Sequence, residues 1–111
     1  MKKKNYLDYI PSISGKNIWD EEEGIVTVHM AHRGFYHKFA QLFFKTPKVS
    51  HIKLDEFGSF VWLNIDGQKS VYDISLLVKE RFGEKAEPLY ERLIKFFQIL
   101  KNNRFVYLRS E

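Results

Sequence analysis

The stretch Leu54–Gly67, LDEFGSFVWLNIDG, constrains the fold of this chain more than any other. Asp55 precedes the apolar residues and can accept hydrogen bonds from the free N–H groups of a first helical turn. Gly67 can adopt the left-handed conformation that often follows a helix. The stretch therefore predicts a helix that ends at Asp66-Gly67. Gly58 inside it costs about 1 kcal/mol relative to Ala, a cost that a side chain packed closely there would explain.

Start and stop signals also mark the segments around this helix. Residues 25–30 are mostly β-branched, and with the turn residues Glu22-Glu23-Gly24 before them they are typical of a β-hairpin. Ser70 and Asp73 form a capping box at the start of a second helix, which Gly83 ends. The expected elements are strands at 17–21, 25–30 and 49–54, helices at 55–66, 70–83 and 88–102, and a short strand at 104–108.

This order predicts one α+β domain, a winged-helix-like arrangement in which a small antiparallel sheet is followed by three helices. The 111 residues suffice for one domain with a core. Residues 1–16 contain Pro11, Ser12 and Gly15 and are expected to form a flexible N-terminal arm, leaving 17–111 as the domain. Residues 33–45, RGFYHKFAQLFFK, have helical apolar spacing and predict an inserted basic, aromatic helix. That helix either covers one edge of the core or lies on a membrane or a partner.

Composition excludes several classes of protein. The chain has no cysteine, so disulfides, thiolate metal sites and cysteine nucleophiles are excluded. It has no apolar run near the roughly 18 residues of a membrane span and no secretory signal, so we expect a cytoplasmic protein. His29, His32 and His37 lack nearby carboxylates at metal-binding spacing. With no catalytic triad or phosphate-binding loop either, we expect neither an enzyme nor a cofactor.

The net charge of +4 is unevenly distributed along the chain. Between Gly24 and Leu54 there is no Asp or Glu, while five of the Lys and Arg residues and all four histidines lie there. The distribution is either an ordinary solvated surface or one basic face that would favour an anionic partner.

The third helix carries more apolar surface than a core-facing helix needs. One stripe is Leu89, Leu93, Phe96 and Leu100, and a second beside it is Tyr90, Ile94, Phe97 and Lys101. Together the stripes span an arc of about 160°, against the roughly 100° that packing requires. The second stripe is therefore expected to be covered by the N-terminal arm or the 33–45 helix of the same chain. The alternative is that it lines a groove beside the 49–54 strand.

The motifs of the central stretch and its surroundings carry a resemblance. In order, they are Leu54-Asp55-Glu56, Gly58, Val61-Trp62, Asp66-Gly67, the S-x-x-D start at Ser70 and Phe82-Gly83. In this arrangement residues 49 to 108 resemble the PqqD family, whose members are small peptide chaperones. The resemblance implies that a precursor (leader) peptide binds as an extra strand between the third strand and the third helix. It also implies a partner enzyme that modifies the peptide, typically a radical S-adenosylmethionine enzyme.

Carried over by position, the resemblance assigns a set of peptide-binding residues. Lys53 and Lys101 in this set would suit an acidic leader. The exposed strand edge also allows a homodimer. The full set is Val49, Ser50, His51, Ile52, Lys53, Tyr90, Ile94, Phe97 and Lys101.

A winged-helix DNA-binding regulator is the alternative function. A helix–turn–helix followed by a strand and a pI near 9.3 permit it. However, the helix that would enter the DNA begins with Glu84, Glu87 and Glu91, which would lie near phosphates. The sequence therefore favours a peptide partner over nucleic acid.

Overall fold

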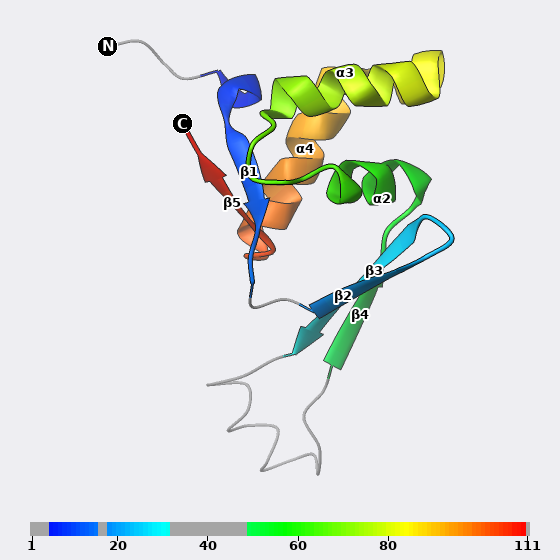
Figure 1. Cartoon of the computed structure of the whole chain (residues 1–111), viewed down its shortest axis with the longest axis vertical. Helices are drawn as coiled ribbons and strands as arrows, with labels where there is room; N and C mark the ends of the chain where they lie inside the picture. Colours follow the sequence, from blue (N-terminus) through cyan, green and yellow to red (C-terminus); the bar gives the residue numbers. More distant parts are fainter. Residues whose placement is uncertain (1–4, 16–17, 32–48, 111) are drawn as a thin grey trace.

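The structure is a computed structural model that describes residues 5–15, 18–31 and 49–110 (Figure 1). Within these ranges it confirms an α+β fold with a small antiparallel sheet and three helices. The helix predicted at 33–45 lies outside the described residues. The elements are η1 (Tyr6–Asp8), β1 (Ile10–Ile13), β2 (Ile18–Glu22), β3 (Ile25–Ala31), β4 (Val49–Lys53), α2 (Glu56–Leu63), α3 (Val71–Phe82), η2 (Gly83–Ala86), α4 (Leu89–Asn102) and β5 (Val106–Arg109).

The three strands β2, β3 and β4 form one antiparallel sheet in that order. The predicted hairpin is present: Glu23 and Gly24 have φ of 53° and 83°, which a tight two-residue turn between twisted strands requires. Val26 and Val28 on the central strand β3 are fully buried. The sheet therefore presents an apolar face to the helices through β3.

The helix starts follow the capping residues that the sequence contains. Asp55 accepts a hydrogen bond from the backbone N–H of Gly58 at 2.7 Å at the start of α2. Ser70 and Asp73 form both bonds of the capping box at the start of α3, each at 3.0 Å. Gly83, with φ of 60°, follows the end of α3 as predicted. These local signals were sufficient because each involves residues within one helical turn.

The helix α2 ends earlier than predicted, at Leu63 rather than at Asp66. The Asn64 side chain donates a hydrogen bond to the Phe60 carbonyl at 2.8 Å and ends the helix there. Asp66 instead organises a separate turn, in which its Oδ1 accepts from the backbone N–H groups of Gln68 and Lys69. The polar side chains that follow the apolar residues thus shorten the helix by competing for backbone groups.

Residues 5–15 do not match the expected flexible arm. They form η1 and β1, and β1 pairs with β5 in a second, two-stranded sheet in which Ile10 lies opposite Arg109 and Ile13 opposite Val106. Pro11, fully buried, is tolerated because the strand pairs on one side within the described residues. The Tyr9 carbonyl accepts a hydrogen bond from the N–H of Val71. The segment is held by pairing partners far away in the sequence.

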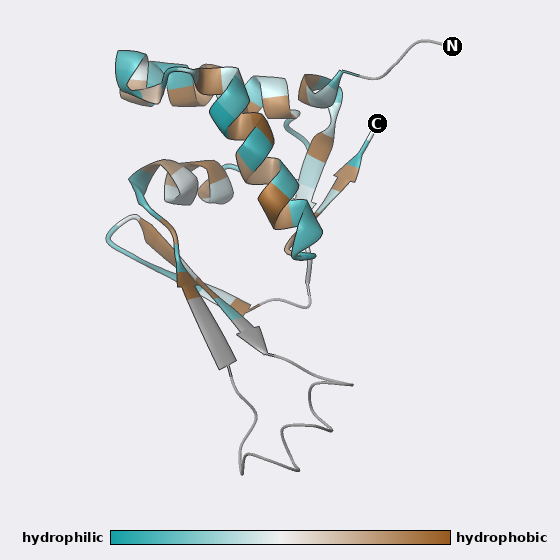
Figure 2. Cartoon of the chain, turned by 180° about the vertical axis from the view of Figure 1, so that it is seen from behind, coloured by the Kyte–Doolittle hydropathy of each residue, from teal (hydrophilic) through white to brown (hydrophobic). Residues whose placement is uncertain are grey.

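The core lies between the helices and the two sheets (Figures 1 and 2). Figure 1 shows the three helices on one side of the β2–β3–β4 sheet, with the β1–β5 pair running beside α4. The largest fully buried side chains include Trp62, Phe97 and Ile74, one from each helix. Within the described ranges, no helix is both long and apolar enough to cross a membrane.

Candidate functional site

The strand β4 is an edge strand within the described part of the chain, because β3 is its only paired neighbour there. Ile52 lies opposite Val28 and is half-buried, while Lys53 lies opposite Thr27 and is exposed. This alternation is typical of a strand with one face towards the core. An edge strand of this kind presents backbone donors and acceptors to which another strand can bond.

The hydrogen bonding of β4 identifies which of its backbone groups face the free edge. The N–H of Leu54 donates to the Val26 carbonyl at 2.8 Å, so this opposed pair is a hydrogen-bonded one. In an antiparallel ladder such pairs alternate with pairs that do not bond to each other. By that alternation the amides of Ile52 and Ser50 face β3. The backbone N–H groups of Lys53, His51 and Val49 therefore face the free edge.

The two outer edges of this sheet differ in charge. The strand β2 is exposed at all five positions and carries Asp20, Glu21 and Glu22. Carboxylates along an edge disfavour the approach of another strand, above all an acidic one. The strand β4 has no carboxylate and ends in Lys53. Of the two edges, the β4 edge is the one suited to an anionic extended segment.

The helix α4 meets the chain just beyond β4 through Phe96. A Cβ added at Gly58 would lie 3.1 Å from Phe96 Cε1, so the ring packs against the glycine itself. The Phe96 ring is also 6.5 Å from that of Phe57, in the first turn of α2. The close packing that the sequence predicted at Gly58 is confirmed. Phe96 is half-buried and packs against the first turns of α2, the helix that follows β4.

Arg92 lies one helical turn before Phe96 on the same side of α4. Its guanidinium carbon is 4.2 Å from the centroid of the Phe57 ring, and Nη1 donates to the Lys85 carbonyl at 3.0 Å. Ile99, 49% exposed, continues this side one turn further. We call Arg92, Phe96 and Ile99 the α2-side flank of α4.

The predicted helix wall lies elsewhere on α4. Phe97 is fully buried in the core and Phe96 only half-buried, the reverse of their predicted places. At 100° per residue, Tyr90, Ile94 and Lys101 lie roughly 60–100° to one side of the buried Leu93. The α2-side flank lies roughly 60–120° to the other side of it. Thus the residues after β4 meet Arg92 and Phe96, on the flank that the sequence prediction did not choose.

The remaining candidates do not gather into a site in the described ranges. His29 Nε2 is 2.7 Å from Asp20 Oδ2 across β2 and β3. No group of three His, Asp or Glu residues placed to hold a metal occurs among the described residues. His32 and His37 lie outside them.

The helix α4 begins near exposed carboxylates, as the sequence indicated. Glu84, Glu87 and Glu91 are all exposed. Phosphates of a nucleic acid would be repelled at this end of the helix.

A family model described as "Coenzyme PQQ synthesis protein D (PqqD)" matches residues 45–106, more than half of the chain. The matched range includes β4, α2, α3 and α4, and therefore both parts of the candidate site. Neither the curated proteins nor the solved structures that were compared gave a match.

Proposed function

This chain belongs to the PqqD family, and we propose that it is a non-catalytic chaperone that binds a precursor (leader) peptide by strand addition. In this proposal it presents the bound peptide, in the cytoplasm, to an enzyme that modifies it. We expect that enzyme to be a radical S-adenosylmethionine enzyme. The observation that carries the proposal is the β4 edge, which has no carboxylate and leads into the first turns of α2, on which the half-buried Phe96 packs.

The proposed binding follows from the backbone groups of β4. The N–H groups of Val49, His51 and Lys53 and the neighbouring carbonyls would bond to the peptide backbone, which supplies affinity for many sequences. Ser50 and Ile52 support this edge through β3. The chaperone has no chemistry of its own in this proposal. It raises the local concentration of the peptide at the enzyme and fixes its orientation.

Side-chain selectivity is assigned to the α2-side flank of α4. Phe96, packed on Gly58 at the start of α2, and the exposed Ile99 one turn further along α4 offer apolar surface on this flank. Phe97 supports the wall from the core rather than contacting the peptide, because its side chain is fully buried. Tyr90, Ile94 and Lys101 lie on the opposite flank of α4.

The test removes one free-edge N–H without removing a bond to β3. In His51→Pro the amide that faces the free edge is lost and the proline ring blocks an added strand, whereas proline is tolerated in edge strands. His51→Val is the matched control, since it removes the imidazole and keeps the N–H. The probe is a phage-displayed library of random 12-residue peptides, from which the best binder is synthesised and its affinity measured by calorimetry.

We expect His51→Pro to weaken the peptide at least about tenfold and His51→Val to change its affinity less than about twofold. Hydrogen exchange of the Lys53, His51 and Val49 amides should slow when the peptide is bound. Equal affinity of both variants would contradict strand addition at β4. Failure of the wild type to enrich any peptide would contradict the peptide-binding proposal itself.

The DNA-binding alternative predicts a different response to salt. Binding to DNA should weaken steeply between 50 and 200 mM salt because counterions are released from the phosphates. The exposed Glu84 and Glu87 before α4, and Glu91 in its first turn, argue against it. Binding of duplex DNA with such a salt dependence, without enrichment of peptides, would favour the regulator.

A further inference from the structure

The guanidinium of Arg92 is held in place and has no anionic partner within the described part of the chain. It stacks 4.2 Å from the centroid of the Phe57 ring, and Nη1 donates to the Lys85 carbonyl. Among the described residues, the ion pairs are His29 with Asp20 and Lys69 with Asp66, so Arg92 forms none. A planar guanidinium fixed on a ring face, with donors left over, matches a carboxylate in a two-bond geometry.

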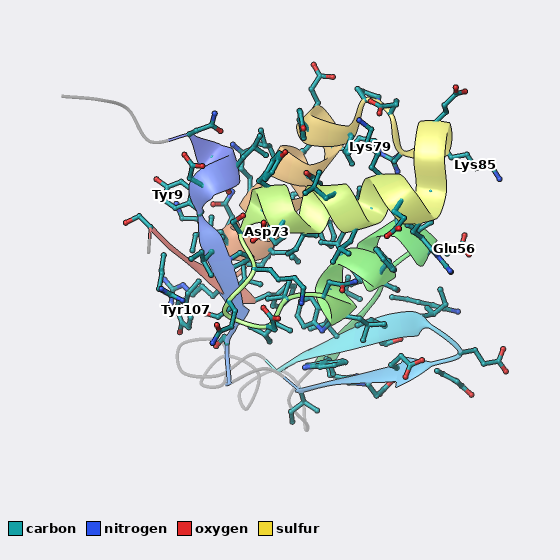
Figure 3. All side chains as sticks on the ribbon, turned by 45° about the horizontal axis from the view of Figure 1, so that its top comes forward. Tyr9, Glu56, Asp73, Lys79, Lys85 and Tyr107 are labelled. Atoms are coloured by element: carbon teal, nitrogen blue, oxygen red, sulfur yellow. The ribbon has the colours of Figure 1, made fainter. Side chains whose placement is uncertain are left out.

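Arg92 also lies where an added strand would leave the sheet. Phe57, on which it stacks, is in the first turn of α2 directly after β4. Figure 2 shows β4 and α4 both towards the viewer, so the β4 edge and α4 are on the same side of the molecule. Figure 3 shows the labelled Lys85 and Glu56 at the same end of the molecule. A peptide paired along β4 and continuing past Lys53 would pass this end.

A second arginine on the same aromatic cluster provides a comparison. The rings of Phe96, Phe57, Phe82 and Phe60 follow one another with centroid separations of 6.5, 6.0 and 5.6 Å. Arg92 lies over Phe57 near the β4 end of this row. Arg81 lies 5.7 Å from both Phe60 and Phe82 at the other end, is exposed and also forms no ion pair in the described ranges. The two arginines share chemistry and differ in their place relative to β4.

We propose that Arg92 determines peptide specificity by binding a carboxylate of the peptide, so that the preferred peptides carry Asp or Glu just beyond the segment paired with β4. The inference rests on the proposed function and adds to it the class of peptide and the residue that recognises it. The acidic β2 edge works in the same direction, because Asp20, Glu21 and Glu22 repel such a peptide from the other free edge. Lys53 adds attraction without a fixed geometry.

The experiment selects random 12-residue peptides against three proteins in parallel: the wild type, Arg92→Gln and Arg81→Gln. We expect the wild type and Arg81→Gln to enrich Asp or Glu at one fixed distance from an apolar, strand-forming segment. Arg92→Gln should lose that enrichment and keep the apolar segment. In a synthetic peptide from the wild-type selection, replacing the acid by its amide should cost about tenfold in affinity for the wild type and almost nothing for Arg92→Gln.

A charge reversal keeps the test independent of any loss of stability in Arg92→Gln. Arg92→Glu should enrich Lys or Arg at the position where the wild type enriches an acid. Enrichment of acids that persists in Arg92→Gln, or that is lost equally in Arg81→Gln, would overturn the assignment while leaving peptide binding intact. Peptides selected without any charged preference would overturn it as well. A wild type that selects no peptide at all counts against the proposed function rather than against Arg92 alone.

Discussion

Tyr6 combines a buried hydroxyl with a shifted titration. Its Oη is buried and has no hydrogen-bond partner among the described residues, and the ring packs edge-on to that of Tyr9 at 5.4 Å. Burial, and secondarily repulsion from Tyr9, raise the pKa of the Tyr6 hydroxyl. Removing an unsatisfied buried hydroxyl removes a desolvation cost. We therefore expect Tyr6→Phe to raise the free energy of unfolding by about 1 kcal/mol.

The raised pKa gives this substitution a pH signature. The folded protein keeps the Tyr6 proton more tightly than the unfolded chain, in which the pKa is near 10.0. Stability from this group is therefore complete below pH 10 and is lost as pH rises through the folded pKa. Urea unfolding at pH 8 and above pH 10 should show that Tyr6→Phe lacks this loss. Tyr107→Phe, 56% exposed, is the control and should change stability at pH 8 little. A destabilised Tyr6→Phe would mean that the hydroxyl is satisfied.

At the scale of elements, one serine joins α2 to the sheet. Ser59 Oγ accepts a hydrogen bond from the N–H of Val26 at 2.8 Å and lies 3.4 Å from the Leu54 carbonyl, to which it donates. The Ser59 hydroxyl thus bridges the Val26 N–H and the Leu54 carbonyl in place of a direct backbone hydrogen bond between them, at the point where the chain passes from β4 into α2. Without it, the buried N–H of Val26 would have no partner in the described structure.

Ser59→Ala should therefore lower the free energy of unfolding by about 1–3 kcal/mol, the cost of an unsatisfied buried donor. Ser75→Ala is the matched control, because Ser75 is equally buried but its hydroxyl donates within its own helix, to the Tyr72 carbonyl. We expect the control to stay within about 0.5 kcal/mol of the wild type, since alanine favours the helix. Urea unfolding midpoints measure both. Equal effects of the two substitutions would refute the role of Ser59 in anchoring β3.

Features that depend on neighbouring residues were predictable from the sequence, whereas pairing between distant segments was not. The starts of α2 and α3 were predictable because Asp55, and Ser70 with Asp73, act on backbone groups within one turn. The β1–β5 pair was not, because the sequence of β1 is short and its partner is near the other end of the chain. Local pattern therefore predicted the helix starts and the hairpin, whereas pairing between distant segments was missed.

The candidate site shows the same division. The β4 edge followed from the order of a hairpin and a third strand, which the sequence shows. The flank of α4 did not, since Phe96 and Phe97 are adjacent and equally apolar. Which of the two enters the core depends on a different helix, because Gly58 in α2 leaves space for the ring of Phe96. Arg92 was missed because its signal is the ring of Phe57 beneath it, a contact that no spacing within α4 reveals.

At the scale of the whole molecule, the β1–β5 sheet joins the two ends of the described fold. Ser14 donates its backbone N–H to the Phe105 carbonyl at 2.8 Å, and Tyr9 accepts from Val71. Tyr6, Leu7 and Ile13 pack against the core cluster. Residues 5–15, the described part of the expected arm, thus belong to the packed structure.

This predicts that the segment is needed for stability. A chain that begins at Ser14 loses η1, β1 and the pairing of β5, and with them the fully buried Pro11. Because each buried apolar side chain contributes about 1.5–3 kcal/mol, we expect a loss of more than about 3 kcal/mol against a chain that begins at Asn5. That is a large share of the roughly 5–15 kcal/mol of a typical domain. Urea unfolding of the two chains measures the difference, and circular dichroism shows whether the shorter one folds. Equal urea midpoints of the two chains would support the original expectation of a flexible arm. The β1–β5 sheet would then contribute little to stability and would not be needed to hold α3 and α4 in place.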